Sequence, residues 1–152
     1  MTRKKASKQK KVFLQRHPKI YLRDTGHKGR GVFCSVNLAK GATLEITPGI
    51  VLNEAATAHV DKTILENYTF VTGAISKRLR QRKGIRNTDN CSTVIMGIAS
   101  FCNHTNTPNA EIVWEEVDGT VYYTLHTTRA IAKNTEICTS YGAGWFESRQ
   151  KK

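Results

Sequence analysis

Short β-prone segments, each broken by turn residues, constrain the fold of this chain more than any other feature of its sequence. Gly, Pro, Asn and Asp lie between them, and these residues favour turns. The segments are KIYLRDT (19–25), GVFCSV (31–36), ATLEIT (42–47), GIVLN (49–53), YTFVT (68–72), AEIVWEEV (110–117) and TVYYTLHTT (120–128). Many short strands with few helices predict a β-rich domain.

Three turn signals locate the ends of strands. Asp118-Gly119 predicts a hairpin between the segments at 110–117 and 120–128. Pro48-Gly49 predicts a break between ATLEIT and GIVLN. LAKGATLEI (38–46) and IAKNTEICT (131–139) share a pattern in which Gly or Asn precedes a β-prone run. Gly and Asn tolerate left-handed backbone, so we expect the same tight entry into a strand at both places.

Helical patterns are few. Residues 54–68 (EAATAHVDKTILENY) are alanine-rich and predict a helix, and VIMGIASFC (94–102) predicts a short apolar one. The basic run at 77–90 contains Gly84 and shows no apolar period, so we expect a surface loop. FCNHTNTPN (101–109) neither alternates like a strand nor continues a helix, and its Pro and Asn predict a loop of specified shape.

Positive charge is concentrated in separate segments of this 152-residue chain, whose net charge is +12. Residues 1–30 contain eleven Lys or Arg and one acidic residue, and residues 77–86 (KRLRQRKGIR) contain six Lys or Arg and no acidic residue. We expect these segments to bind nucleic acid or another polyanion, or else only to keep the chain in solution. The intervening segments are mildly acidic, which suits a cationic substrate.

Cysteine spacing and hydropathy exclude several classes of protein. Cys34, Cys91, Cys102 and Cys138 form no CxxC pair, so we predict free thiols and no metal site. No apolar run approaches the roughly 20 residues that a membrane helix needs, and the basic N-terminus does not resemble a secretory signal. We therefore expect a soluble intracellular protein, cytoplasmic, or nuclear in a eukaryotic cell, with no membrane partner.

Three stretches then occur in a meaningful order: GHKGRGVF (26–33), FCNHTNTPN (101–109) and TEICTSYG (135–142). Together they resemble the SET-domain protein lysine methyltransferases, most closely the compact viral and bacterial members. The resemblance implies a mainly β fold with short helices, a β-clip of several small sheets with a pseudoknot near the C-terminus. The catalytic domain would span 18–146, with a variable insert at about 54–95, between a basic disordered tail (1–17) and a basic C-terminal tail (147–152).

The activity implied by the resemblance is methyl transfer from S-adenosyl-L-methionine to a lysine amine. The substrate would be a basic protein of histone, nucleoid or ribosomal type. Tyr141 would be the catalytic residue, its hydroxyl orienting the amine. The other implied site residues are Lys28, Gly29, Arg30, Gly31, Asn103, His104 and Trp145 for the cofactor, joined by Tyr141, and Tyr68, Phe70, Tyr141 and Phe146 for the substrate channel.

Several of these roles have plain structural alternatives. Tyr68 could pack as an ordinary core aromatic, Lys28 and Arg30 could belong to a solvated turn, and the imidazole of His104 could be structural. Either Trp145 or Phe146 could stack on adenine or close the channel. Asn106 occupies the usual cysteine position of the loop. Thr139 and Ser140 replace the aromatic and acidic residues that often precede the last tyrosine of the family, and this leaves the number of methyl groups open.

Two other functions remain open at this point. One is a non-catalytic SET-like module that binds nucleic acid or a protein partner through its basic regions. The other is a plain nucleic-acid-binding protein, although no recognition motif of that class is present. An exposed strand face could also pair two copies into a homodimer.

Overall fold

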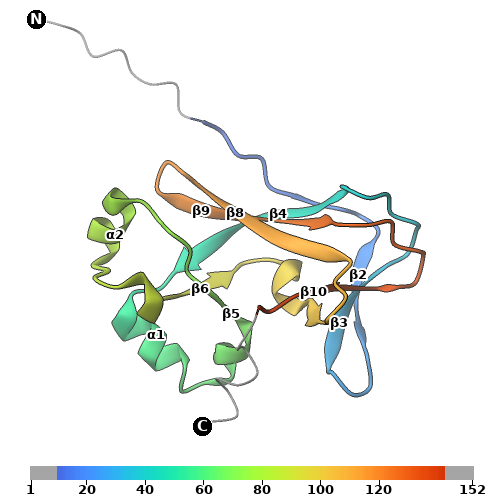
Figure 1. The fold of residues 1–152 in the computed structure, drawn as a ribbon, viewed down its shortest axis with the longest axis horizontal. Coiled ribbons are helices and arrows are strands. Elements are labelled where there is room, and N and C mark those ends of the chain that lie inside the picture. Colours follow the sequence, from blue (N-terminus) through green and yellow to red (C-terminus); the bar gives the residue numbers. More distant parts are fainter. Residues whose placement is uncertain (1–9, 143–152) are drawn as a thin grey trace, which may run out of the picture.

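The computed structural model describes residues 10–142, and two sheets form most of that part of the chain (Figure 1). The larger sheet has the order β5-β6-β4-β9-β8, with β1 also paired to β4, and the smaller has the order β2-β3-β10-β7. The strands are β1 (Gln15–Arg16), β2 (Ile20–Asp24), β3 (Arg30–Cys34), β4 (Thr43–Val51), β5 (Thr69–Val71), β6 (Ser92–Ile95), β7 (Asn103–His104), β8 (Ala110–Val117), β9 (Thr120–Thr127) and β10 (Glu136–Thr139). The predicted β-rich class is confirmed.

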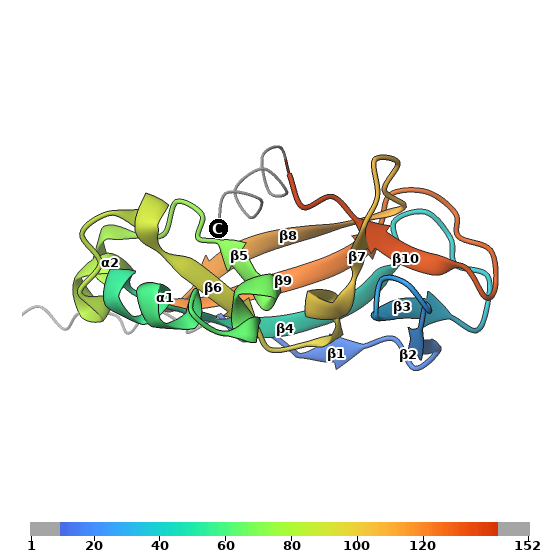
Figure 2. The same ribbon diagram turned by 90° about the horizontal axis from the view of Figure 1, so that it is seen from below.

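Helical elements are short. They are α1 (Glu54–Val60) and α2 (Lys77–Lys83), with the 3₁₀ turns η1 (Ile64–Tyr68), η2 (Thr88–Asn90) and η3 (Ile98–Phe101). Both α-helices lie at one end of the molecule, and the β2–β3 hairpin lies at the other (Figures 1 and 2). No helix in the described residues is long and apolar enough to cross a membrane.

The predicted turns around two strand entries and one hairpin are confirmed. β8 and β9 pair from Ala110↔Thr127 to Val117↔Thr120, and Asp118 and Gly119 between them have positive φ angles of 50° and 78°. Gly41 and Asn134 have φ angles of 80° and 64°, so both repeat copies enter their strands through left-handed backbone. The copies also meet, because Leu38 and Ile131 exchange two backbone hydrogen bonds.

The predicted break at Pro48-Gly49 is wrong, because β4 runs through it without interruption. On one edge of β4, residues 45 and 46 pair with β1 and residues 49–51 pair with β6. Pro48 falls between these two stretches, where a missing N–H is tolerated. Gly49 is required by packing, since a Cβ there would meet the ring of Tyr123 at 2.5 Å.

The surface loop expected at 77–90 is also wrong, because α2 occupies its first half. Ser76 caps the helix by accepting a hydrogen bond from the Leu79 N–H, and Gly84 ends it at a φ of 68°. Leu79 is the one buried residue of the helix, and Ile85 packs into the core directly after it. A single buried position in seven residues leaves no helical period for sequence inspection to detect.

The other two helix predictions are correct only in part. Residues 54–68 form α1 and η1, separated by a turn at 61–63. Residues 94–102 finish β6 at Ile95 and then make only the one turn of η3.

The core lies between the sheets and includes the fully buried side chains of Leu44, Leu125 and Ile137. All four cysteines are buried free thiols, as predicted. Residues 15 and 16, which the sequence assigned to a disordered tail, form β1 and pair with Ile46 and Glu45. Residues 10–14 and 17 of the predicted tail are described and belong to no helix or strand, and residues 1–9 and 147–152 lie outside the described residues.

Candidate active site

The last strand holds the loop at 101–109 in place. β10 pairs in parallel with β7, with Cys138 opposite Asn103 and Thr139 opposite His104. The buried Asn109 side chain accepts from the Cys138 N–H at 2.9 Å and donates to the Glu136 carbonyl at 2.8 Å. Asn109 therefore fixes the exit of the loop against β10. Threading of the chain through a pseudoknot stays a prediction.

Asn103 is oriented by a carboxylate that the sequence did not single out. Its Nδ2 donates to Glu136 Oε1 at 2.7 Å and, at 3.4 Å, to the Arg30 carbonyl. Since Nδ2 is held in this way, Oδ1 is the end of the amide left to accept from a ligand. A Cβ on Gly31 would collide with the Glu136 carboxylate, so the glycine admits this pair. The resemblance implied a role for Gly31 at the cofactor, whereas in the structure this glycine makes room for the Asn103–Glu136 pair.

His104 holds the backbone of Tyr141. The Tyr141 N–H donates to His104 Nδ1 at 3.1 Å, so Nδ1 carries no proton in this arrangement. Nε2 then carries the hydrogen and donates to Asn106 Oδ1 at 3.1 Å. The His104 and Tyr141 rings also lie 5.4 Å apart. The imidazole thus has the structural role that the sequence left open, and it lies directly beside the expected catalytic residue.

The Tyr141 hydroxyl donates to the Cys102 carbonyl at 2.9 Å. Burial, followed by the nearby Cys102, Cys138, Glu136 and Tyr68, raises the pKa of Tyr141 to about 12. The phenol is therefore neutral at physiological pH and is too weak an acid to ionise and act as a base there. A hydroxyl oxygen can accept a hydrogen bond as well as donate one, so Tyr141 can orient a donor such as an amine.

Alkaline titration should reveal this buried phenol. An unfolded tyrosine ionises near pH 10, whereas the folded pKa of Tyr141 is about 12. Its contribution to stability is complete below pH 10 and is lost as the pH rises towards 12, because the unfolded chain then binds fewer protons. We expect the free energy of unfolding, from urea denaturation, to fall more steeply between pH 10 and 12 in the wild type than in Tyr141→Phe. Equal slopes would contradict the burial of this hydroxyl.

The glycine turn before β3 is built by Thr25. The Thr25 hydroxyl and N–H both donate to the Gly29 carbonyl, at 2.8 and 2.7 Å, and the hydroxyl accepts from the Lys28 N–H. Gly29 has a φ of 69°, which explains the glycine by backbone conformation. The turn places the exposed Lys28 and Arg30 at the rim of a cavity, where their charges can reach an anionic group.

Two cavities meet at Tyr141. The first, of about 540 Å³, is lined by the glycine turn, β7 and two aromatic rings; its residues include Lys28, Gly29, Arg30, Tyr68, Phe101, Asn103 and His104. The second, of about 680 Å³, is lined by α1, β5 and residues 89–92 and contains the carboxylates of Glu54, Asp61, Glu66 and Asp89. Asn67, Ser100 and Tyr141 line both. A molecule in one cavity can therefore contact a molecule in the other at Tyr141.

Most of the predicted site residues come together, but not always where we expected. Lys28, Gly29, Arg30, Asn103, His104 and Tyr141 gather around the first cavity, with Gly31 behind Asn103. Tyr68, expected in the substrate channel, lines this first cavity and contacts Phe101 at 5.5 Å between ring centroids. Phe70 lines the acidic cavity. Trp145 and Phe146 lie outside the described residues.

Sequence inspection missed three kinds of site residue. Glu136 lies in the TEICTSYG motif, so its nearness to Tyr141 along the chain could be seen in the sequence, but its hydrogen-bond partner Asn103 could not. Asn67 and Ser100 line both cavities, and no sequence pattern predicted either of them as a site residue. The four carboxylates of the second cavity are spread over residues 54–89. Only the mildly acidic net charge of the segments between the basic runs indicated that they could matter.

Comparison with known proteins gives consistent results. The family model described as the SET domain matches residues 29–142. Over 130 residues, 84% of this chain and 77% of the relative, the chain is 31% identical to the Schizosaccharomyces pombe protein "Histone-lysine N-methyltransferase, H3 lysine-37 specific".

Two solved structures share the fold. One is a candidate histone methyltransferase of Plasmodium falciparum, with a TM-score of 0.57 and 22% identity over 87% of this chain and 98% of that one. The other is the Neurospora SET domain protein DIM-5, a histone lysine methyltransferase, with a TM-score of 0.59 and 18% identity over 81% of this chain and 52% of that one.

Proposed function

The chain belongs to the SET-domain family and is a protein-lysine methyltransferase, and from this premise we propose that it transfers methyl groups from S-adenosyl-L-methionine to a lysine in a basic protein segment. The observation that carries the proposal is the meeting of two unlike cavities at Tyr141. One has cations, an amide and aromatic rings, and the other has carboxylates.

The first cavity fits the cofactor. Lys28 and Arg30 at its rim can bind the carboxylate of the methionine portion, and Asn103 Oδ1 can accept from its ammonium group. The Tyr68 and Phe101 rings supply an apolar wall for an adenine. When bound there, S-adenosylmethionine would supply an electrophilic methyl group on a positively charged sulfur.

The residues around Tyr141 would favour the neutral form of the lysine amine and orient it. In water this amine has a pKa near 10.4 and is almost wholly protonated at neutral pH, so it must lose a proton before its lone pair can attack. Partial burial and a neighbouring sulfonium both disfavour the ammonium form, and the proton can pass to water. The neutral Tyr141 hydroxyl then accepts a hydrogen bond from the amine and aligns it. The nitrogen gains the methyl group as the methyl–sulfur bond breaks.

The second cavity favours a basic substrate. Four carboxylates line this cavity together with Tyr141. The pKa of Glu54 is lowered by hydrogen bonds from the Asn87 and Arg86 N–H groups, which keeps it ionised. Lysine or arginine residues flanking the target lysine would be attracted to these charges. The name of the fission-yeast relative specifies histone H3, and we propose a substrate of that kind, a histone-like, nucleoid or ribosomal protein.

Transfer of labelled methyl groups tests the proposal. Purified enzyme with methyl-labelled S-adenosylmethionine should label a basic histone-tail peptide, and replacing the target lysine by arginine should abolish the label. Calorimetric titration of the cofactor in the absence of peptide should show saturable one-to-one binding. If the folded protein shows no binding at millimolar cofactor, the assignment of the first cavity is wrong.

The acidic cavity makes a separate prediction about the peptide. We expect Asp61→Asn combined with Asp89→Asn to raise the KM for a basic peptide by roughly fivefold, because two attractive charges are removed from its path. The cofactor dissociation constant should not change. Glu115→Gln is the matched control, since it removes an exposed carboxylate outside both cavities. A double variant with an unchanged peptide KM at low salt would exclude this surface as the peptide site.

A further inference from the structure

Glu45 is a buried carboxylate that the chemistry described above does not use. It lies on β4, its side chain is 2% exposed, and it lines neither of the two cavities that meet at Tyr141. A buried charge requires hydrogen-bond partners, and Glu45 has three. Its Oε1 accepts from the Ile98 N–H at 3.0 Å, and its Oε2 accepts from the Ala99 N–H at 2.8 Å. The third partner is Arg16, whose Nε donates to Oε1 at 3.0 Å.

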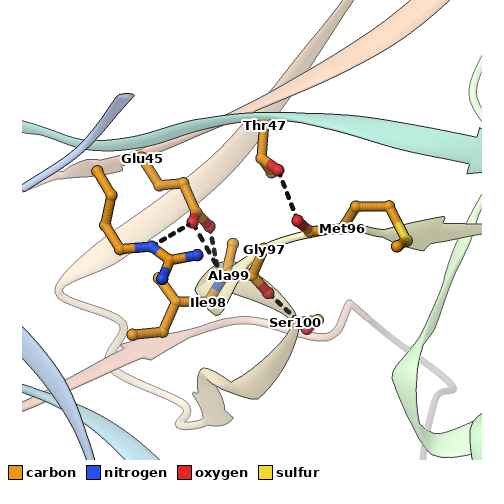
Figure 3. Close-up of polar contacts among 8 residues, drawn as sticks. Glu45, Thr47, Met96, Gly97, Ile98, Ala99 and Ser100 are labelled. Carbon is orange, nitrogen blue, oxygen red and sulfur yellow. Dashed lines mark hydrogen bonds and ion pairs between the residues drawn. The ribbon is translucent and has the colours of Figure 1, made fainter. Parts of the chain in front are cut away.

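The carboxylate is fitted to the turn at 96–100 (Figure 3). Figure 3 shows Glu45 directed at the start of η3, with Thr47 reaching the same turn from the same strand. The Thr47 hydroxyl donates to the Met96 carbonyl at 2.9 Å. A Cβ on Gly97 would collide with the Glu45 carboxylate, so the glycine is needed to admit it. Two inward-facing side chains of β4 therefore define where η3 begins.

η3 in turn carries the wall on which both cavities depend. Ser100 lines the first and the second cavity, and Phe101 packs against Tyr68 in the first. Cys102, which follows η3 directly, provides the carbonyl that accepts the Tyr141 hydroxyl. A shift of η3 would move this carbonyl, and with it the hydroxyl that orients the amine.

β1 supplies the third partner of the Glu45 carboxylate. Arg16 lies directly opposite Glu45 in the β1–β4 ladder, and its side chain is 56% exposed. Without Arg16, the carboxylate would keep only the two backbone donors while remaining buried. A buried charge without a charged partner is unfavourable, so the Glu45 carboxylate would then move towards solvent, away from Ile98 and Ala99.

We propose that Glu45, held by Arg16, is a positioning residue for methyl transfer, which fixes η3 and through it the Cys102 carbonyl and Tyr141. β1 is then part of the catalytic apparatus, although it precedes the domain bounds expected from the sequence. Small displacements of reacting groups lower rates strongly, so the pair acts on kcat more than on folding.

Steady-state kinetics of Arg16→Ala, compared with Lys10→Ala, tests the proposal. Both remove one basic residue and one ion pair from the same N-terminal arm, but Lys10 pairs with the exposed Glu115 at 2.6 Å. At a temperature where each variant is fully folded, we expect Arg16→Ala to lower kcat about tenfold and Lys10→Ala to stay within about twofold of wild type. Arg16→Lys, which retains the charge, should recover most of the loss.

A second measurement does not depend on activity. Amide hydrogen exchange of Ile98 and Ala99 should accelerate in Arg16→Ala and not in Lys10→Ala, because only the former loosens the bonds to Glu45. Equal kcat for the two variants, or unchanged exchange at Ile98 and Ala99, would overturn the proposal. Glu45→Gln is a further variant for the same two measurements. If it fails to fold, the Arg16 variants still test the proposal.

Discussion

Tyr141→Phe is expected to lower kcat for methyl transfer by roughly 100-fold or more while leaving cofactor binding within about threefold of wild type. The substitution keeps the ring that contacts His104 and removes only the hydroxyl that donates to the Cys102 carbonyl. The lost hydroxyl is also the group that we propose to accept from the lysine amine. Because the pKa of Tyr141 is about 12, its hydroxyl does not act as a base, and kcat is expected to fall because the polar group that orients the amine is missing.

Single-turnover methyl transfer and calorimetry on the same protein sample measure both parts of this expectation. The matched control is Tyr122→Phe, which removes a phenol from β9 outside the residues that line the two cavities. Its rate should equal that of the wild type. If Tyr141→Phe retained full activity, Tyr141 would be a packing residue of the last strand and the catalytic group would have to lie elsewhere.

The parts of this fold that follow from local chemistry could be predicted from the sequence. Asp118-Gly119 and the pair Gly41 and Asn134 need positive φ angles, and short-range preference alone is enough to identify them. α2 could not be predicted in the same way, because Leu79 is its only buried residue and its caps, Ser76 and Gly84, are individually common. The uninterrupted β4 depends on which neighbours pair with each edge, which is a property of the whole sheet.

The same distinction between local and long-range causes applies to the residues of the site. Asn103, His104 and Tyr141 belong to motifs, and the structure brings them together. Glu45 and Glu136 matter because of the backbone or amide groups that they meet across the fold, 53 and 33 residues away in the sequence. Two glycines, Gly31 and Gly97, are explained by these carboxylates rather than by a turn. Such long-range partners leave no pattern in one sequence.

Asn103→Ala is expected to weaken S-adenosylmethionine binding by roughly 10- to 100-fold, which corresponds to the loss of one or two hydrogen bonds of about 1–2 kcal/mol each. The alanine removes the Oδ1 acceptor at the first cavity and leaves the Glu136 carboxylate without its 2.7 Å donor. Calorimetric titration measures the change. Asn37→Ala is the matched control, because it removes a side-chain amide that also makes a hydrogen bond, accepting from the Lys133 N–H, and Asn37 lines neither cavity.

Glu136→Gln separates orientation from charge at the same place. A glutamine can still present an oxygen to Asn103 Nδ2, so if Glu136 acts by orienting Asn103, cofactor binding should stay within about threefold of wild type. If the negative charge itself attracts the cofactor's cationic groups, Glu136→Gln should lose nearly as much affinity as Asn103→Ala, and increasingly so at low salt. Since Gly31 leaves room for either side chain, the two outcomes differ only in charge, and the first is the one that the hydrogen-bond geometry predicts.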